Sequence, residues 1–321
     1  MGRPVKKFHD FVGQKRVINF LRKIIVGAKT LGQSCPPLLL KAPTGCGKSS
    51  LAKTVALEYE SNFHLLLAGQ EVQAIDICQM LSRLEFGDVF AIDEAHSLSS
   101  DSQQILYLAL DEQRIPVISD GKIDRSQYVS IAEFCLVLAT NEPGSLKRAL
   151  ANRLHHVELE PYSLEELKAI AETIAEKRNF HITPQSARRL VEVAQGSPRN
   201  VYKLVELLRL FNPKVSHFTE THVVELLNGQ GIDQKGLTPK QRQYLITLIN
   251  SPLGICTLGR LSVALGYDIF AIKRDVEPYL IEQRWVDPNS SRGRKLTDEG
   301  RDLTKQILAD ELLNPFSLTL K

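Results

Sequence analysis

Residues 42–49, with the sequence Ala-Pro-Thr-Gly-Cys-Gly-Lys-Ser, constrain the fold of this chain more than any other segment. They follow the apolar run 37–41 and precede the helix-compatible stretch 49–58. A strand, a glycine-rich turn and Gly-Lys-Ser at a helix start form the context of a phosphate-binding loop, whose backbone N–H groups hold phosphate oxygens. The alternative is an ordinary turn between a strand and a helix. The pattern predicts a nucleoside triphosphate site made of Pro43, Thr44, Gly45, Cys46, Gly47, Lys48, Ser49 and Ser50.

Two acidic residues supply the second element of this chemistry. Asp93 and Glu94 follow the apolar run 89–92, which is typical of a strand buried in a parallel sheet. Open α/β sheets bind ligands at the carboxyl ends of their strands. We therefore expect Lys48 to neutralise the β- and γ-phosphates, and Ser49 and Asp93 to hold Mg²⁺. Glu94 is the expected general base for the attacking water. Taken alone, the pair also fits a surface turn with two solvated acids.

Four further candidates for the ATP site are single polar or cationic side chains. The apolar run 134–139 leads into Thr140 and Asn141, one of which is expected to sense the γ-phosphate; Asn141 also suits the start of a turn. Arg153 could complete the site of a neighbouring subunit, as an arginine finger does. Arg199, just after a proline typical of the first helical position, could reach a phosphate from a helix N-terminus. Both arginines also fit plain surface cations.

Length and composition set the broad class. A chain of 321 residues suggests two or three domains. Hydrophobic content of 43%, charged content of 24% and a net charge of +3 are those of a globular protein and do not by themselves indicate nucleic-acid binding. Five scattered cysteines without a CxxC pair fit reduced thiols. We find neither a signal region nor a membrane-spanning stretch, and we expect a cytoplasmic protein.

The periodicity predicts an α/β P-loop domain with a parallel sheet, a small all-α lid and a winged-helix domain, over residues 1–161, 162–232 and 236–305, with a tail at 306–321. Ser163 and Glu166 form a capping box, and Thr183-Pro184 starts another helix. Residues 228–236 are rich in glycine and polar side chains and are expected to link the lid to the last domain.

The last domain is expected to contain three helices and a hairpin. We predict helices from 238, over 258–265 and over 269–283, and short strands at 285–286 and 295–296. The intervening loop carries Arg292 and Arg294 with the adjacent Lys295, which are candidates for DNA backbone contacts. A solvated turn or a protein-binding wing are the alternatives.

These motifs together resemble the AAA+ ATPases, and within them the RuvB family of Holliday-junction branch-migration motors. The segments 11–14, 93–99, 104–112, 159–167, 276–281 and 292–294 carry the resemblance along nearly the whole chain. It implies that Arg3 and Pro4 lie against the adenine and that Tyr162 contacts the nucleotide. It also implies that Arg153 is the arginine finger and Arg199 the second sensor.

The resemblance also places a partner-binding hairpin at 114–133, which family members use to bind RuvA. Gln127 replaces an apolar residue there, and Ile115, Val117, Ile118 and Val129 remain as apolar candidates. The family's first sensor is usually Thr-Thr, whereas this chain has Thr140-Asn141. Asn289 stands where the first of three loop arginines is expected.

We therefore expect an ATP- and Mg²⁺-dependent DNA motor that works as a homo-oligomeric ring. One alternative is a related loader or remodeller of a clamp, helicase or transposition complex. A further possibility is a specialised relative of the family from a mobile element. Another alternative is a winged-helix DNA-binding protein that uses ATP only as a structural ligand.

Overall fold

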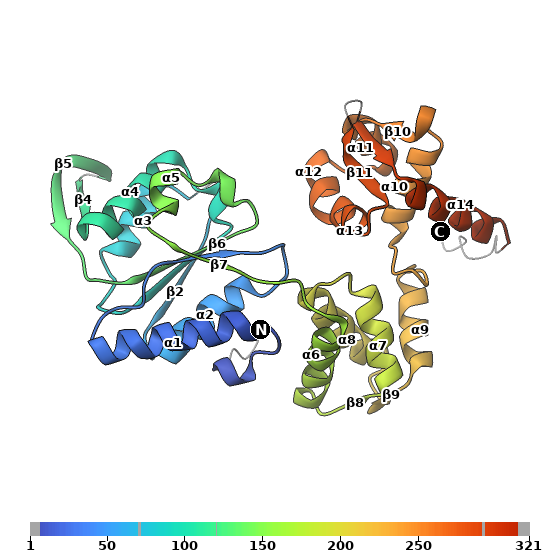
Figure 1. Cartoon of the computed structure of the whole chain (residues 1–321), viewed down its shortest axis with the longest axis horizontal. Coiled ribbons are helices and arrows are strands. Elements are labelled where there is room, and N and C mark those ends of the chain that lie inside the picture. Colours follow the sequence, from blue (N-terminus) through green and yellow to red (C-terminus); the bar gives the residue numbers. More distant parts are fainter. Residues whose placement is uncertain (1–6, 70–71, 120, 291–292, 314–321) are drawn as a thin grey trace. The chain divides into compact units, whose positions relative to one another are not determined.

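The computed structural model describes residues 7–69, 72–119, 121–290 and 293–313 (Figure 1). The chain forms two compact units. The first comprises residues 1–173 together with 196–203, and the second comprises residues 174–195 together with 204–321. The predicted lid, 162–232, is therefore divided between the two units, and the three-domain division stays a prediction.

A five-stranded parallel sheet forms the centre of the first unit. Its strands are β1 (Leu38–Lys41), β2 (Phe63–Leu67), β3 (Val89–Asp93), β6 (Cys135–Thr140) and β7 (His155–Glu158), in the order β2-β3-β6-β1-β7. The three central strands are the apolar runs that the sequence predicts. The edge strands β2 and β7 are mixed in polarity and only partly buried, which is why their pattern was weaker.

The register of this sheet brings the functional loops together. Lys41 at the end of β1 pairs with Thr140 at the end of β6, and β3 lies on the other side of β6. The phosphate-binding loop follows β1, and the two acids stand at the end of β3. All three loops therefore leave the sheet at one edge, as expected for parallel strands.

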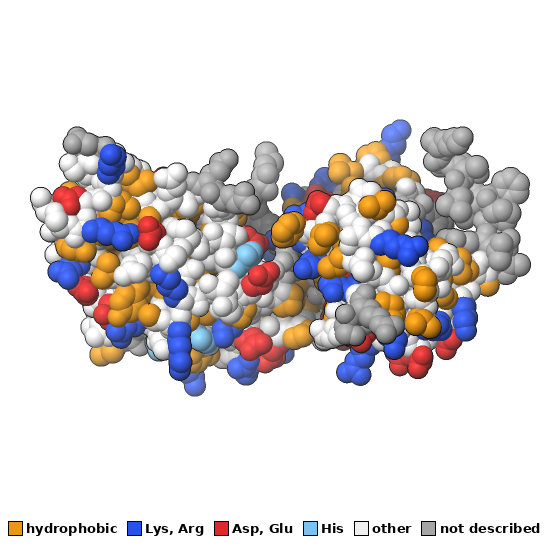
Figure 2. Space-filling model, turned by 90° about the horizontal axis from the view of Figure 1, so that it is seen from above, with side chains coloured by type: hydrophobic (Ala, Val, Ile, Leu, Met, Phe, Trp, Pro, Cys, Tyr) orange, Lys and Arg blue, Asp and Glu red, His pale blue; other side chains and the backbone are white. Residues whose placement is uncertain are grey.

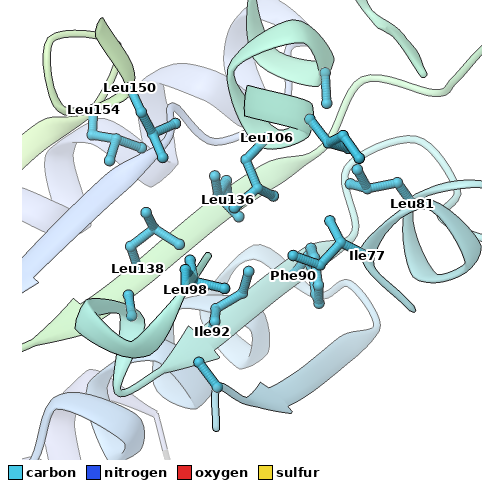
Figure 3. Packing of buried hydrophobic residues seen from close by; sticks show 14 of the residues in the cluster. Ile77, Leu81, Phe90, Ile92, Leu98, Leu106, Leu136, Leu138, Leu150 and Leu154 are labelled. Atoms are coloured by element: carbon cyan, nitrogen blue, oxygen red, sulfur yellow. The ribbon is translucent and has the colours of Figure 1, made fainter. Parts of the chain in front are cut away.

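Apolar side chains pack one face of the sheet against helices. Phe90 and Ile92 of β3 and Leu136 and Leu138 of β6 meet residues of α3 (Ala74–Leu81), α4 (Ser100–Glu112) and α5 (Arg148–Ala151) in one cluster (Figure 3). Helices α1 (Lys15–Leu31) and α2 (Lys48–Tyr59) pack against each other on the opposite side (Figure 1). This buried apolar layer holds the strand ends in fixed positions beneath the site.

The segment after the sheet is helical, with one small addition. Its helices are α6 (Leu164–Lys177), α7 (Pro184–Val193), α8 (Pro198–Phe211) and α9 (Glu220–Gly229). The predicted capping box forms, because the Ser163 amide donates to Glu166 and the Glu166 amide donates to Ser163 Oγ. Two-residue strands β8 (His181–Ile182) and β9 (His217–Phe218) pair in parallel, which the sequence did not indicate.

The winged helix contains the predicted helices α10 (Pro239–Ile249) and α11 (Leu258–Leu265). The third predicted helix forms as one uninterrupted helical segment, made of α12 (Ile269–Ala271), a π-helical turn (Ile272–Val276) and α13 (Glu277–Glu282). Pro278 explains the π-helical turn, since it lacks an N–H and its ring would collide with the Arg274 carbonyl of a regular α-helix.

The wing is formed by β11 (Val286–Ser290) and β12 (Gly293–Leu296), and the unpredicted β10 (Ile255–Cys256) adds a third strand. The last helix, α14 (Asp298–Leu313), crosses the boundary predicted at 305. Leu303 and Ile307 on this helix pack into the hydrophobic core of the winged helix, together with residues of α10 and α11. The helix therefore continues into the segment that the sequence analysis assigned to the tail.

Candidate ATP site

The phosphate-binding loop lines a cavity of about 210 Å³ in the first unit. Gly45 and Gly47 adopt φ values of 88° and 94°, which side-chain-bearing residues rarely adopt. A Cβ at Gly45 would also lie 2.6 Å from Ser197 Oγ, so glycine is required there for space as well. The cavity is lined by Thr44, Gly45, Gly47, Lys48, Ser49, Ser50, Asp93, Glu94 and Arg199, all of which the sequence singled out. Pro43 and the buried Cys46 belong to the same loop but do not line it.

Lys48 is held inside the loop. Its ammonium group donates to the carbonyl oxygens of Ala42 at 2.8 Å and Pro43 at 3.1 Å. Burial lowers the pKa of Lys48, and the nearby Asp93 carboxylate opposes this shift. A phosphate anion in the cavity would favour the charged form in the same way, so the ammonium is placed to bind anionic oxygen.

Asp93 and Ser49 meet across the cavity. The Ser49 hydroxyl donates to Asp93 Oδ2, and Asp93 Oδ1 accepts the backbone N–H of Glu94 at 3.0 Å. Two oxygen donors from α2 and β3 therefore stand side by side. Oxygen atoms of this kind are the ligands that Mg²⁺ prefers in proteins.

Glu94 stands directly after β3 in a left-handed backbone conformation, with φ of 55°. A non-glycine residue in this region is uncommon and is often found at functional sites. The conformation turns the chain away from the strand, and the partly exposed carboxylate lines the cavity. Glu94 can therefore reach a water molecule beside a bound phosphate.

Tyr162 and Arg199 border the loop from two sides. A Cβ at Gly47 would lie 3.6 Å from the Tyr162 hydroxyl, and one at Gly45 would lie 3.2 Å from Arg199 Cβ. Burial raises the pKa of the Tyr162 phenol, which stays neutral. Both residues are thus brought to the phosphate-binding loop, and their contacts with nucleotide stay predictions. Arg3 and Pro4, expected at the adenine, lie outside the described residues.

The two sensor candidates, Thr140 and Asn141, differ in burial. Thr140 is fully buried, and its hydroxyl accepts the Glu142 N–H at 3.0 Å and lies 3.5 Å from His96 Nδ1. Asn141 is exposed and is not among the residues that line the cavity. His96, which sequence reasoning did not select, lies between Thr140 and Glu94. Its position two residues after Glu94, in the turn that follows the acidic pair, was the signal that could have found it.

Arg153 lies away from the cavity lining. It forms an ion pair with Asp111, and its guanidinium carbon lies 5.6 Å from the centre of the Tyr107 ring. The phenol of Tyr107 also donates to Asp111, at 3.1 Å. About half of the Arg153 side chain remains exposed. Arg153 therefore lies at the surface, where an arginine that acts on the site of another subunit would have to be.

The predicted hairpin forms from β4 (Arg114–Ser119) and β5 (Lys122–Ser130). Ile115 is buried in the core, and Ile118 packs against it, so these two residues do not offer a partner surface as the sequence suggested. They face inward because the first hairpin strand packs against α4. Val129 and Tyr128 are the exposed apolar residues of this element.

Arg294, one of the predicted DNA contacts, is bound inside the second unit. Its guanidinium binds both carboxylate oxygens of Glu277, at 2.8 and 3.1 Å, and donates to the Pro288 carbonyl at 3.0 Å. The Tyr244 hydroxyl donates to the same carboxylate at 2.7 Å, and Glu277 is 2% exposed. Arg294 therefore ties the wing to α13, and its contact with DNA stays a prediction. Burial and the Glu277 charge raise the pKa of Tyr244.

Of the other two DNA candidates, Lys295 is exposed on β12, and Arg292 lies outside the described residues. Basic side chains are interspersed with acidic and apolar ones on the face that Figure 2 shows, in keeping with the net charge of +3. Any binding of the DNA backbone by the wing therefore depends on a few local cations.

Replacing Arg294 by Ala should destabilise the second unit by about 3 kcal/mol, because it leaves the buried Glu277 carboxylate without its partner. Urea unfolding measures this, and Lys295→Ala is the matched control, with an expected change within about 0.5 kcal/mol. A stable Arg294→Ala protein that has lost DNA affinity would instead support the DNA-contact assignment.

Membrane-spanning helices and clustered metal ligands are both absent from the described part of the chain. No helix there is both long and apolar enough to cross a lipid bilayer. The described side chains also contain no cluster of three or more His, Cys, Asp or Glu residues suited to a metal ion.

Known proteins match this arrangement over nearly the whole chain. The RuvB P-loop domain, described as that of a Holliday junction DNA helicase, matches residues 3–159, and the RuvB C-terminal winged-helix domain matches residues 234–305. A protein of Wolbachia sp. subsp. Drosophila simulans (strain wRi), named "Holliday junction branch migration complex subunit RuvB", is 32% identical over 309 residues, which cover 94% of this chain and 93% of that protein.

The relative with the same name from Thermotoga maritima is 30% identical over 305 residues, which cover 92% of this chain and 90% of the relative. The solved structure of the Thermotoga maritima RuvB branch-migration motor superimposes with a TM-score of 0.81, at 28% identity, over 94% of this chain and 97% of that one. The two domain matches and the relatives that align over most of the chain all indicate the same family, and the chain belongs to the RuvB family.

Proposed function

We propose that this protein is an ATP-hydrolysing motor that drives branch migration of Holliday junctions in DNA recombination and repair. The observation that carries the proposal is the convergence of Lys48, Asp93, Glu94 and Arg199 on one cavity, in a chain that ends in a winged helix. The family relatives named above are subunits of the Holliday junction branch migration complex. A cytoplasmic place of action follows from such a role.

The hydrolysis step can be assigned to side chains of the cavity. Lys48 would exchange its two carbonyl partners for phosphate oxygens and neutralise charge on the β- and γ-phosphates. Glu94 would take a proton from a water whose oxygen forms the new bond to the γ-phosphorus. The bond from that phosphorus to the bridging oxygen breaks, and ADP leaves with its electron pair. Arg199 would stabilise the charge on the transferred phosphoryl group.

Mg²⁺ fits the oxygen donors present. Ser49 Oγ and the Asp93 carboxylate meet at hydrogen-bond distance, and no softer ligand lines the cavity. When bound there, the cation would neutralise charge on the β- and γ-phosphate oxygens. Activity should therefore require millimolar Mg²⁺ and be lost on chelation.

Helix α8 offers a route for transmitting hydrolysis to DNA. It carries Arg199 in its first turn, within the first unit, and continues from Leu204 into the second unit. Contact of Arg199 with the γ-phosphate, and its loss after hydrolysis, would bias the helix between two positions. The winged helix, through Lys295 and the neighbouring Arg292, would hold the DNA backbone without reading its sequence.

We also propose a homo-oligomeric ring in which Arg153 completes the site of the next subunit. Arg153→Ala should then reduce ATPase activity about 10³-fold or more, while each subunit still binds ATP. Mixing Arg153→Ala with Lys48→Ala protein should recover part of the activity, because a subunit with an intact Lys48 can meet an intact Arg153. No recovery in mixtures that do form oligomers would show that Arg153 does not act between subunits.

The proposed function is tested by measuring ATPase activity without DNA, with duplex and with four-way junction DNA, each with and without a junction-binding partner protein. We expect the junction to stimulate turnover most and the partner to increase this further. A strand-exchange assay on a four-way junction distinguishes the motor from a loader, which would hydrolyse ATP on DNA without moving the junction. ATP binding without any turnover would contradict the motor assignment.

A further inference from the structure

His96 occupies a position between the proposed base and the sensor strand. It lies in the short 3-10 turn η2 (Ala95–Ser97) that follows the acidic pair. Its Nε2 atom is 3.5 Å from Glu94 Oε2, and its Nδ1 atom is 3.5 Å from Thr140 Oγ1. Thr140 is fully buried, whereas Glu94 is partly exposed. One imidazole ring thus bridges the ends of β3 and β6.

We propose that His96 is a positioning residue for ATP hydrolysis, which aims the Glu94 carboxylate and couples it to the end of β6. The inference rests on the proposed function, in which Glu94 activates the attacking water. His96 itself does not contact the lytic water or the phosphate in this scheme. It acts through Glu94, and its effect should therefore appear in turnover and not in ATP binding.

The hydrogen-bond donors around the ring favour one tautomer. Thr140 Oγ1 accepts the backbone N–H of Glu142 at 3.0 Å, and this leaves its own hydrogen for His96 Nδ1. A neutral imidazole that accepts at Nδ1 carries its proton on Nε2, the atom that faces the Glu94 carboxylate. The resulting chain runs from the Glu142 amide through Thr140 and His96 to Glu94, with every donor matched to an acceptor. Both ring contacts are long, as catalytic hydrogen bonds often are before substrate binds.

Glu94 has a physical need for such a partner. Its side chain has three rotatable bonds and stands partly exposed at the cavity edge, so a free carboxylate would spread over many rotamers. Of the residues that the structure describes, His96 is the one whose side chain forms a polar contact with this carboxylate. A catalytic group must be held to within about half an ångström to act efficiently. His96 supplies that restraint from the same strand end.

The link to Thr140 gives the restraint a second consequence. Thr140 pairs with Lys41, the last residue of the strand that leads into the phosphate-binding loop. A shift of this strand end on nucleotide binding would move the Thr140 hydroxyl and, through His96, the base. The structure thus connects the occupancy of the loop to the orientation of Glu94 by three side chains.

The test compares His96→Ala with His96→Gln. A glutamine can accept from Thr140 through Oε1 and donate to Glu94 through Nε2, so it should restore most of the turnover. His96→Ala should lower kcat about 10–100-fold, the usual range for residues that orient a functional group. The ATP dissociation constant, measured with fluorescent ATP in the presence of Mg²⁺, and the melting temperature should stay near those of the wild type in both variants.

A second comparison tests whether His96 acts through Glu94. In a Glu94→Gln background, measured by single-turnover release of radiolabelled phosphate, His96→Ala should cause no further loss, because residues that act as a unit are strongly non-additive. Thr140→Val combined with His96→Ala should likewise lose less than the product of the two single effects.

Two results would overturn the proposal: wild-type turnover by His96→Ala, or equal loss of turnover, ATP affinity and melting temperature by both His96 variants. A failure of the proposed function appears elsewhere, as a wild-type protein without ATPase activity or a fully active Glu94→Gln variant. The two failures are therefore distinguished within one set of proteins.

Discussion

Glu94→Gln protein should bind ATP as tightly as the wild type and hydrolyse it at least about 10²-fold more slowly, the low end of what a general base contributes. The amide keeps the size of the side chain and its place beside Asp93, and it lacks the basic oxygen that accepts a proton from water. The measurement pairs kcat from phosphate release with the ATP dissociation constant.

Glu60→Gln is the matched control for this variant. Glu60 lies at the C-terminal end of α2, where it forms an exposed ion pair with Lys29 at 3.3 Å, and such pairs contribute little. Its replacement should leave both turnover and affinity unchanged. Full turnover by Glu94→Gln would remove Glu94 from the role of base, and with it the reason for placing His96 behind it.

Lys48→Ala should weaken ATP binding by about 100-fold or more, which corresponds to ~2.7 kcal/mol of binding free energy. The physical reason is the loss of the one ammonium group that is buried in the loop and lies beside Asp93. Charge-assisted hydrogen bonds to phosphate are among the stronger polar interactions in proteins. Calorimetric titration with a non-hydrolysable ATP analogue and Mg²⁺ provides the measurement.

Lys53→Ala, on the exposed side of the same helix α2, is the control for a general effect of removing a cation. It should bind ATP like the wild type. If Lys48→Ala retains wild-type affinity while its melting temperature falls, the lysine serves the loop alone, through its bonds to the Ala42 and Pro43 carbonyls. That outcome would contradict its assignment as a phosphate ligand.

The ATP site could be predicted from the sequence because its main parts are local. Gly45, Gly47, Lys48 and Ser49 lie within one loop, and their spacing alone places backbone amides and a cation around a phosphate. Asp93 and Glu94 follow an apolar run that had to be a buried strand. The match to RuvB relatives confirms the ATPase fold and the family that these motifs indicated.

Most of the contacts that the sequence did not reveal join distant segments. Arg294 and Glu277 are 17 positions apart, and nothing in their order indicates that the guanidinium turns inward to a buried carboxylate instead of outward to DNA. His96 and Thr140 are 44 positions apart and meet only because β3 and β6 are neighbours in the sheet. The hairpin residue Ile115 looked available for a partner until its strand was placed on the core.

The sequence by itself determined the phosphate-binding loop, the acidic pair, the strands that precede them and the winged helix. Short-range spacing and periodicity encode each of these features. The tertiary structure alone decided which polar groups face the cavity and which are consumed by partners inside the fold. The physical reason is that burial and hydrogen bonding at Arg294, His96 and Thr140 depend on neighbours that chain folding brings together, and a cation or imidazole has the same appearance in a sequence whether it faces water, phosphate or a buried carboxylate.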